Sequence, residues 1–130
     1  MSATARAALD QLSSAFRDRD VERLLSLFSA RPEVTYAGSE LGERATGRGD
    51  LTALLMQVLG RAEAYAFDLP DVRVAEVGDA LSVLAEGTGV AHGPTGDPET
   101  FAYRLTGVLV REQGRWVWLV LVGSEPTAAP

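Results

Sequence analysis

Cysteine and lysine are both absent from this chain of 130 residues. Without cysteine, the protein can have neither a disulfide framework nor a thiolate zinc site. All 12 basic residues are arginine, and together with 18 acidic residues they give a net charge of −6 at pH 7. An acidic chain without a basic stripe argues against binding to the phosphate backbone of a nucleic acid.

Long apolar runs are missing as well. The start, MSATARAALDQ, lacks the apolar segment of a signal peptide. No run approaches the roughly 18 to 20 apolar residues that a membrane-spanning helix needs. We therefore predict a soluble cytoplasmic protein that binds neither nucleic acid nor membrane.

The size of the chain fits one globular domain. A chain of 130 residues buries roughly two-thirds of the surface that its unfolded form exposes, which is enough for a core without disulfides or metals. Residues 1–126 are predicted to form this single domain, and residues 127–130 a loose C-terminal tail.

Three helices are predicted in the first half of the chain. Residues 2–17 carry apolar side chains at helical spacing. Asp20 is placed to cap a second, shorter helix whose apolar face includes Phe28, and Asp50 to cap a third. A short strand around Tyr36 lies between the second and third helices.

The second half of the chain changes to the two-residue period of β-strands. One strand begins at Ala64 and is interrupted by Pro70, and another runs over 81–92. The segment 101–124 then has the pattern of a hairpin that turns at 113–114.

This hairpin is apolar on both faces, whereas a strand with one wet face alternates apolar and polar residues. In its second strand we expect Trp116, Trp118, Val120 and Val122 to share one face. One face of the hairpin must cover the helices, and the other must meet a ligand cavity, a second subunit or both. Which face lines the cavity depends on whether the hairpin contains a bulge, because one extra residue swaps the faces.

Helices followed by strands that are joined by short turns form the α+β pattern. We predict three helices in the N-terminal half, packed on a strongly curved antiparallel or mixed β-sheet. A sheet of this kind forms a cone with a central pocket.

Motifs along nearly the whole chain resemble one known superfamily. They are VTYAG at 34–38, TGRGDL at 46–51, GDAL at 78–81, RxxGRWVW at 111–118 and SEP at 124–126. The combination resembles the SnoaL-like, nuclear-transport-factor-2-like superfamily, which includes ketosteroid isomerases and a kinase association domain. The resemblance implies the cone-shaped fold, commonly dimeric. Its members range from isomerases, polyketide cyclases, dehydratases and hydrolases to non-catalytic modules, so the fold does not decide the function.

The chain departs from similar sequences at positions that are often polar. Val122 stands where a histidine often precedes the final serine. Gly107 and Gly123 stand about where the kinase-association branch has pocket arginines. The resemblance therefore implies a more apolar pocket than usual, without an arginine-lined anion site.

Catalytic chemistry has only weak candidates in this sequence. His92, the only histidine, would titrate near neutrality as a general base, but it precedes a Gly-Pro loop where an exposed histidine is common. A buried carboxylate is the other route, because an apolar environment raises its pKa. The candidates are Asp68, Glu86 and Glu40. Glu86 has an ordinary alternative, a cross-strand ion pair with Arg104.

The sequence predicts neither a metal site nor a cofactor. No second ligand is spaced to help His92 hold a metal. The glycine-rich segment 37–49, in which we expect at most a short strand at 43–46, lacks the Lys-Ser/Thr ending of a phosphate-binding loop.

A pocket is predicted from apolar and aromatic side chains. A buried phenol needs a hydrogen-bond partner, which is either a ligand or the backbone, so Tyr36 and Tyr103 are the leading pocket residues. The predicted ligand-binding set is Phe28, Tyr36, Tyr65, Phe67, Tyr103, Leu105 and Leu119.

Two functions remain open. The first is non-catalytic binding of an apolar small molecule, or assembly, which the missing histidine at Val122 favours slightly. The second is an enzyme of the isomerase or polyketide-cyclase type that uses a buried carboxylate or His92 as general base. Catalysis requires a buried acid or histidine at a cavity lined by Tyr36 or Tyr103, whereas a binding module is expected to have no ionisable side chain at the cavity base. In both cases we expect a homodimer through the sheet face.

Overall fold

The computed structural model of the chain describes residues 1–128. Its first half contains α1 (Ser2–Arg17), α2 (Val21–Ser26), β1 (Thr35–Ala37), β2 (Arg44–Thr46) and α3 (Arg48–Leu59). Its second half contains four long strands, β3 (Ala64–Val77), β4 (Ala80–His92), β5 (Glu99–Glu112) and β6 (Arg115–Ser124). Residues 129–130, which belong to the predicted tail, lie outside the described residues.

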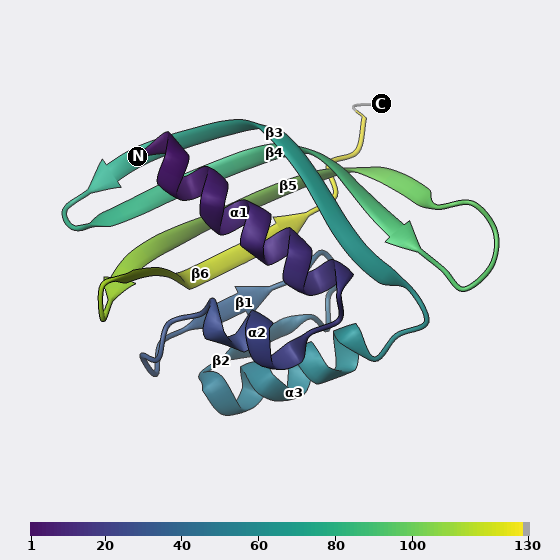
Figure 1. Cartoon of the computed structure of the whole chain (residues 1–130), viewed down its shortest axis with the longest axis horizontal. Coiled ribbons are helices and arrows are strands. Elements are labelled where there is room, and N and C mark those ends of the chain that lie inside the picture. Colours follow the sequence, from purple (N-terminus) through teal and green to yellow (C-terminus); the bar gives the residue numbers. More distant parts are fainter. Residues whose placement is uncertain (129–130) are drawn as a thin grey trace.

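The six strands form one sheet in the order β2-β1-β6-β5-β4-β3. Every neighbouring pair is antiparallel except β1 and β6, which run parallel. Figure 1 shows the long strands curving around α1, with α2 and α3 below them. The predicted α+β architecture, three helices on a curved mixed sheet, is therefore confirmed.

The start of α3 differs from the prediction. The helix begins at Arg48, directly after Gly47, whose φ of 85° lies in the region that favours glycine. Asp50 therefore lies in the first turn and does not cap the helix. Its carboxylate still lies near the positive end of the helix dipole.

The second helix is shorter than its apolar stripe predicts. Asp20 caps it as expected, because its carboxylate accepts a hydrogen bond of 3.0 Å from the N–H of Arg23. The helix ends at Ser26, however, and Phe28 forms an isolated β-bridge with Trp118. Pairing with β6 thus replaces the last helical turn.

Strand β3 continues through Pro70, where an interruption was predicted. Its register against β4 shifts between Asp68 and Asp71, so the proline lies in an irregular part of the ladder. β3 is an edge strand, where a missing N–H can face away from the sheet. A side chain at Gly87 would collide with the carbonyl of Asp68, so glycine is the residue that lets this irregularity pack against β4.

A second irregularity lies in the final hairpin. Val120 pairs with Val108 and Trp118 pairs with Leu109, so Leu119 is an extra residue in β6. Trp118 consequently belongs to the main core, whereas Val120 does not. The prediction that both tryptophans share a face with Val120 was wrong. The bulge at Leu119 puts Val120 on the opposite face of the sheet from Trp118.

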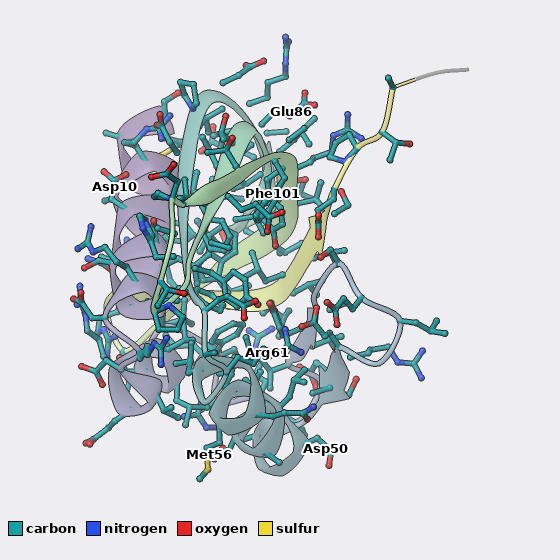
Figure 2. The ribbon with its side chains drawn as sticks, turned by 90° about the vertical axis from the view of Figure 1, so that its right-hand side faces the viewer. Asp10, Asp50, Met56, Arg61, Glu86 and Phe101 are labelled. Carbon is teal, nitrogen blue, oxygen red and sulfur yellow. The ribbon has the colours of Figure 1, made fainter. Side chains whose placement is uncertain are left out.

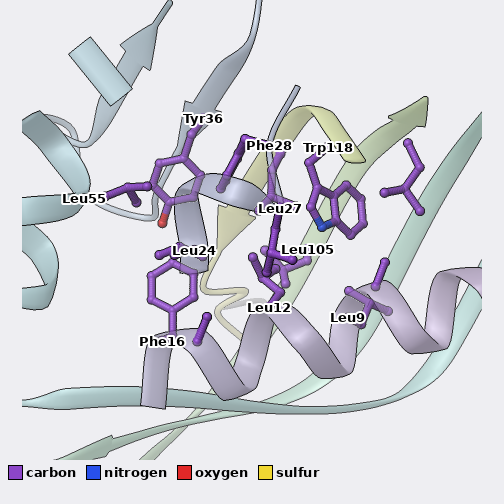
Figure 3. Close-up of a cluster of buried hydrophobic side chains, with 14 of the residues drawn as sticks. Leu9, Leu12, Phe16, Leu24, Leu27, Phe28, Tyr36, Leu55, Leu105 and Trp118 are labelled. Carbon is purple, nitrogen blue, oxygen red and sulfur yellow. The ribbon is translucent and has the colours of Figure 1, made fainter. Parts of the chain in front are cut away.

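The main core lies between α1 and the inner face of the sheet (Figure 3). Leu12 of α1 is fully buried, and Trp118 is only 1% exposed. Core side chains do not fill all of the space beneath the sheet. A space is left near Phe16, in the last turn of α1.

Candidate functional site

A cavity of about 70 Å³ lies at the end of the sheet where β3 begins and β6 finishes. Six of the residues that line it are aromatic, namely Phe16, Tyr36, Tyr65, Phe67, Phe101 and Tyr103. The polar residues that line it are Ser39, Glu40, Glu43, Arg61 and Glu125. Figure 2 shows Arg61 just above α3 and Phe101 on the curved sheet above it.

The aromatic rings hold one another in place. Phe67 and Tyr103 stack, with ring centroids 4.8 Å apart and planes 12° from parallel. Phe16 and Phe101 meet this pair edge-on, Phe16 against Phe67 and Phe101 against Tyr103. Aromatic pairs in these two arrangements each contribute about 0.5–1.5 kcal/mol beyond simple burial. The wall of the cavity is therefore preformed.

Two phenols lie in this wall. Tyr36 is 5% exposed and Tyr103 is 6% exposed, and neither hydroxyl has a hydrogen-bond partner within residues 1–128. Every fully buried side-chain polar atom of the described chain is satisfied, so these hydroxyls must reach the open space of the cavity. Burial raises the pKa of both phenols, and the Glu43 carboxylate raises both further. Both side chains are therefore neutral donors at physiological pH.

Glu43 is the buried carboxylate of the site, 8% exposed. Its Oε1 accepts a hydrogen bond of 3.1 Å from the N–H of Glu40, and its Oε2 lies 2.8 Å from Nη1 of Arg61. The Tyr65 hydroxyl and then the Glu43 carboxylate raise the pKa of Arg61, so the guanidinium stays charged. A side chain at Gly38 would collide with the Glu43 carboxylate.

Glycine also makes room for the phenol on the opposite wall. A side chain at Gly123 of β6 would collide with the hydroxyl of Tyr103 on β5. The space that a side chain at position 123 would fill is therefore occupied by the Tyr103 hydroxyl of the neighbouring strand.

Four of the residues predicted to bind a ligand line the cavity, namely Tyr36, Tyr65, Phe67 and Tyr103. The other three do not line it. Phe28 and Leu105 are buried in the main core, and Leu119 is the bulged residue of β6.

Of the predicted catalytic candidates, Glu40 lines the cavity, whereas His92, Asp68 and Glu86 lie outside its lining. Glu86 pairs with Arg104 in the ladder between β4 and β5, with Nη2 of the arginine 2.8 Å from Oε2. The cross-strand alternative for Glu86 is therefore what the structure shows. Asp68 and His92 are exposed strand residues.

Sequence reasoning missed Glu43, Arg61 and Glu125. They come from the loop before β2, the segment after α3 and the segment after β6, so no local spacing links them. The only clue was the glycine-rich composition of 37–49, because Gly38 provides the room that the Glu43 carboxylate occupies.

The fold and the cavity define an α+β domain with three helices, a curved mixed sheet and a partly polar internal site. The chain belongs to the SnoaL-like domain family, which matches residues 5–128. A comparison with curated proteins gave no match.

Solved structures from several bacteria share the fold. A candidate dehydratase of the NTF2-like family from Streptomyces avermitilis is 21% identical, with a TM-score of 0.83 over 96% of this chain and 95% of that one. An NTF2-like superfamily protein from Salmonella enterica is 13% identical (TM-score 0.80, 95% and 89% covered). ActVI-ORFA from Streptomyces coelicolor is 15% identical (TM-score 0.78, 95% and 96% covered). At these identities the similarity shows the fold alone.

Within residues 1–128, no helix is both long enough and apolar enough to cross a membrane. The same residues contain no group of three or more histidine, cysteine, aspartate or glutamate side chains placed to hold a metal ion.

Proposed function

We propose that this SnoaL-like domain binds a small molecule that presents an oxygen atom to Tyr36 and Tyr103. The observation that supports the proposal is the pair of buried phenols that face the cavity without a protein partner in the described chain. A neutral hydrogen bond contributes about 0.5–1.5 kcal/mol, so a ligand acceptor would gain about that much from each phenol. A carbonyl oxygen suits the site because it can accept from both hydroxyls at once.

The size of the cavity limits the ligand. A water molecule needs roughly 10–15 Å³ of such space. A cavity of about 70 Å³ that opens to solvent at its rim suits a compound with one small ring better than a fused polycycle.

Binding without catalysis is the function that the geometry supports best. An ionisable group, Glu43, does lie in the cavity with Tyr36 and Tyr103, which is the arrangement expected of an acid–base enzyme. Both oxygens of its carboxylate already have protein partners, however, namely the N–H of Glu40 and the guanidinium of Arg61. Glu43 would have to give up a partner to take a proton from a substrate. An isomerase or cyclase with Glu43 as base is the second candidate.

The test is a titration with acetophenone, a ketone with one ring, followed through the backbone amide shifts of cavity residues. We expect Tyr103→Phe to weaken acetophenone binding about fivefold, since a neutral hydrogen bond contributes about 1 kcal/mol. Glu86→Gln is the control, because Glu86 lies outside the cavity lining and pairs with Arg104 on the neighbouring strand.

Ethylbenzene, which keeps the ring but lacks the oxygen, separates the phenols from simple apolar burial. Its binding should not change in Tyr103→Phe. The proposal fails if acetophenone does not shift the cavity amides, or if both compounds lose the same affinity in this variant.

We also propose that a second copy of the chain covers the outer face of the sheet. The face carries five valines on β5 and β6: Val108, Val120 and Val122 are at least partly exposed, whereas Val110 and Val117 are already buried within the chain. None of the five belongs to the main core. A stable interface of standard size buries about 800 Å² per partner, and apolar side chains are typical of homodimer interfaces.

Light scattering after size-exclusion chromatography measures the oligomeric state. The wild-type protein should be a dimer at micromolar concentration, and Val122→Arg should be a monomer. Val77→Arg, at an exposed valine of the edge strand β3, is the control and should leave the dimer intact. A monomeric wild-type protein would contradict the proposal.

A further inference from the structure

We infer that the ligand of this cavity is a small organic cation, an ammonium compound that enters past an acidic rim into a box of aromatic rings. The inference rests on the proposed function, because it concerns the ligand of the same cavity. It names the charge of that ligand, which neither the fold nor the family determines.

The charges at the rim are unbalanced. Glu40, Glu43 and Glu125 line the cavity, and Arg61 is the one guanidinium among the residues that line it. Arg61 is already held by two of these carboxylates, at 2.8 Å from Glu43 and 3.8 Å from Glu40. The rim is therefore net negative, and an anionic ligand would meet an excess of like charge.

Glu125 carries the excess charge. Its carboxylate accepts a hydrogen bond from the hydroxyl of Ser39 and forms no ion pair with the arginines of residues 1–128. It follows β6 directly and lies near enough to Tyr103 to influence the phenol. A ligand ammonium group at the rim would supply the missing partner.

The interior suits a cation as well. Rings from three strands (β1, β3 and β5) and from α1 line the cavity, and the faces of aromatic rings attract cations such as alkylammonium groups. The phenol of Tyr36, 5% exposed, faces the same space without a protein partner in the described chain, and this supports a ligand site independently of the carboxylates. The oxygens of both phenols can also face an ammonium group.

Three probes of nearly equal size and shape separate charge from volume. Tetramethylammonium is the cation, tert-butyl alcohol is neutral and pivalate is the anion. Each is titrated into the full chain at constant ionic strength, and the amide shifts of Gly38, Glu43, Tyr103 and Gly123 report binding at the cavity. We expect tetramethylammonium to bind at least about fivefold more tightly than tert-butyl alcohol, and pivalate to bind most weakly.

Two variants with the same change in net charge test where the preference arises. Glu125→Gln should reduce the preference for the cation about threefold, because it removes the unpaired carboxylate from the rim. Glu86→Gln removes a carboxylate outside the cavity lining and should leave the preference unchanged. Circular dichroism confirms that both variants fold.

The inference is overturned if tert-butyl alcohol or pivalate binds as tightly as tetramethylammonium, if no probe shifts the cavity amides, or if Glu86→Gln has the same effect as Glu125→Gln. The acetophenone titration then decides separately whether the cavity binds ligands at all. Acetophenone binding without a preference for cations would leave the proposed function standing and remove only the assignment of charge.

Discussion

The inner face of the sheet is filled around Trp118, here called the solid end, and hollow beside Tyr103, here called the hollow end, although the same long strands build both regions. At the solid end, the ring of Trp118 lies against Gly107 of the neighbouring strand, and Leu12 of α1 packs in the same core. At the hollow end, the phenol of Tyr103 lies against Gly123 in a similar cross-strand arrangement.

The covering layer makes the difference between the two ends. α1 runs over the solid end and stops at Arg17 (Figure 1). Beyond it, the cover consists of the loop before β2 and the segment after α3, which bring Glu43 and Arg61. A regular helix fills the space with apolar side chains, whereas the loop leaves a cavity with polar walls. An aromatic ring therefore lies against a glycine at both ends, but the Trp118 ring is part of the core and the Tyr103 ring is part of the candidate site.

The largest expected effect comes from the same substitution at the two glycines. In Gly107→Ala the new methyl group meets the backbone carbonyl of Val120 as well as the Trp118 ring, and neither can move far. We expect a loss of about 1–3 kcal/mol in the free energy of unfolding, measured by urea denaturation and circular dichroism.

Gly123→Ala is the matched change at the hollow end. Its methyl group meets the end of the Tyr103 side chain, which can move into the cavity. We expect a loss below about 1 kcal/mol in stability but weaker binding of acetophenone. Equal losses of stability in the two variants would show that the hollow end is as tightly packed as the solid end. This result would contradict the difference in packing between the two ends.

A smaller effect on stability is expected from Glu112, whose carboxylate joins β5 to the segment after α2. Glu112 accepts hydrogen bonds from the Ser29 hydroxyl and, at 2.9 Å, from the N–H of Ala30. These bonds, the Ser29 bond first, lower the pKa of Glu112 below its ordinary value of 4.5. Its contribution to stability is therefore present above about pH 4.5 and is lost as the pH falls through the lowered value.

Glu112→Gln keeps the shape of the side chain and removes the charge. At pH 7 the variant should be about 1 kcal/mol less stable than wild type, and the gap should close as the pH falls below 4.5. Thermal unfolding measured between pH 3 and 7 checks this sign. A gap that is constant over the whole range would mean that the carboxylate is not stabilised by these bonds.

The smallest effect is expected outside both regions, at the ion pair between Glu86 and Arg104. Their side chains are 38% and 44% exposed. An exposed pair of this kind contributes about 0–1 kcal/mol. Glu86→Gln should therefore change the urea midpoint by less than Gly107→Ala does, and a larger change would point to a role that the geometry does not show.

Periodicity and resemblance predicted the fold well because both report on long, regular elements. The helical spacing in 2–17 and the alternation in 101–124 each correspond to one element or one hairpin. Irregular positions were harder to predict. The residue types around Leu119 do not distinguish a bulge from a regular strand. The bulge alone determines that Trp118 faces the core and Val120 does not.

The sequence predicted much of the aromatic half of the candidate site, but among the charged residues of the cavity only Glu40. Tyr36 and Tyr103 could be found because a phenol at an inward strand position needs a partner. The charged half depends on where irregular segments meet in space. Glu43 and Arg61 approach only because the loop before β2 and the exit of α3 fold toward each other, and a sequence pattern contains no information about that approach.

The parallel pairing of β1 with β6 has a consequence for how the chain folds. Tyr36 lies opposite Leu121, so one wall of the cavity is joined to β6, the strand that is furthest from β1 along the sequence. Contacts between residues so distant along the chain form slowly, because a large loop must close first. We expect the antiparallel strands β3 to β5 to pair early and the cavity to be completed only when β6 arrives. A chain shortened before β6 could therefore hold much of its secondary structure and still have no place for a ligand.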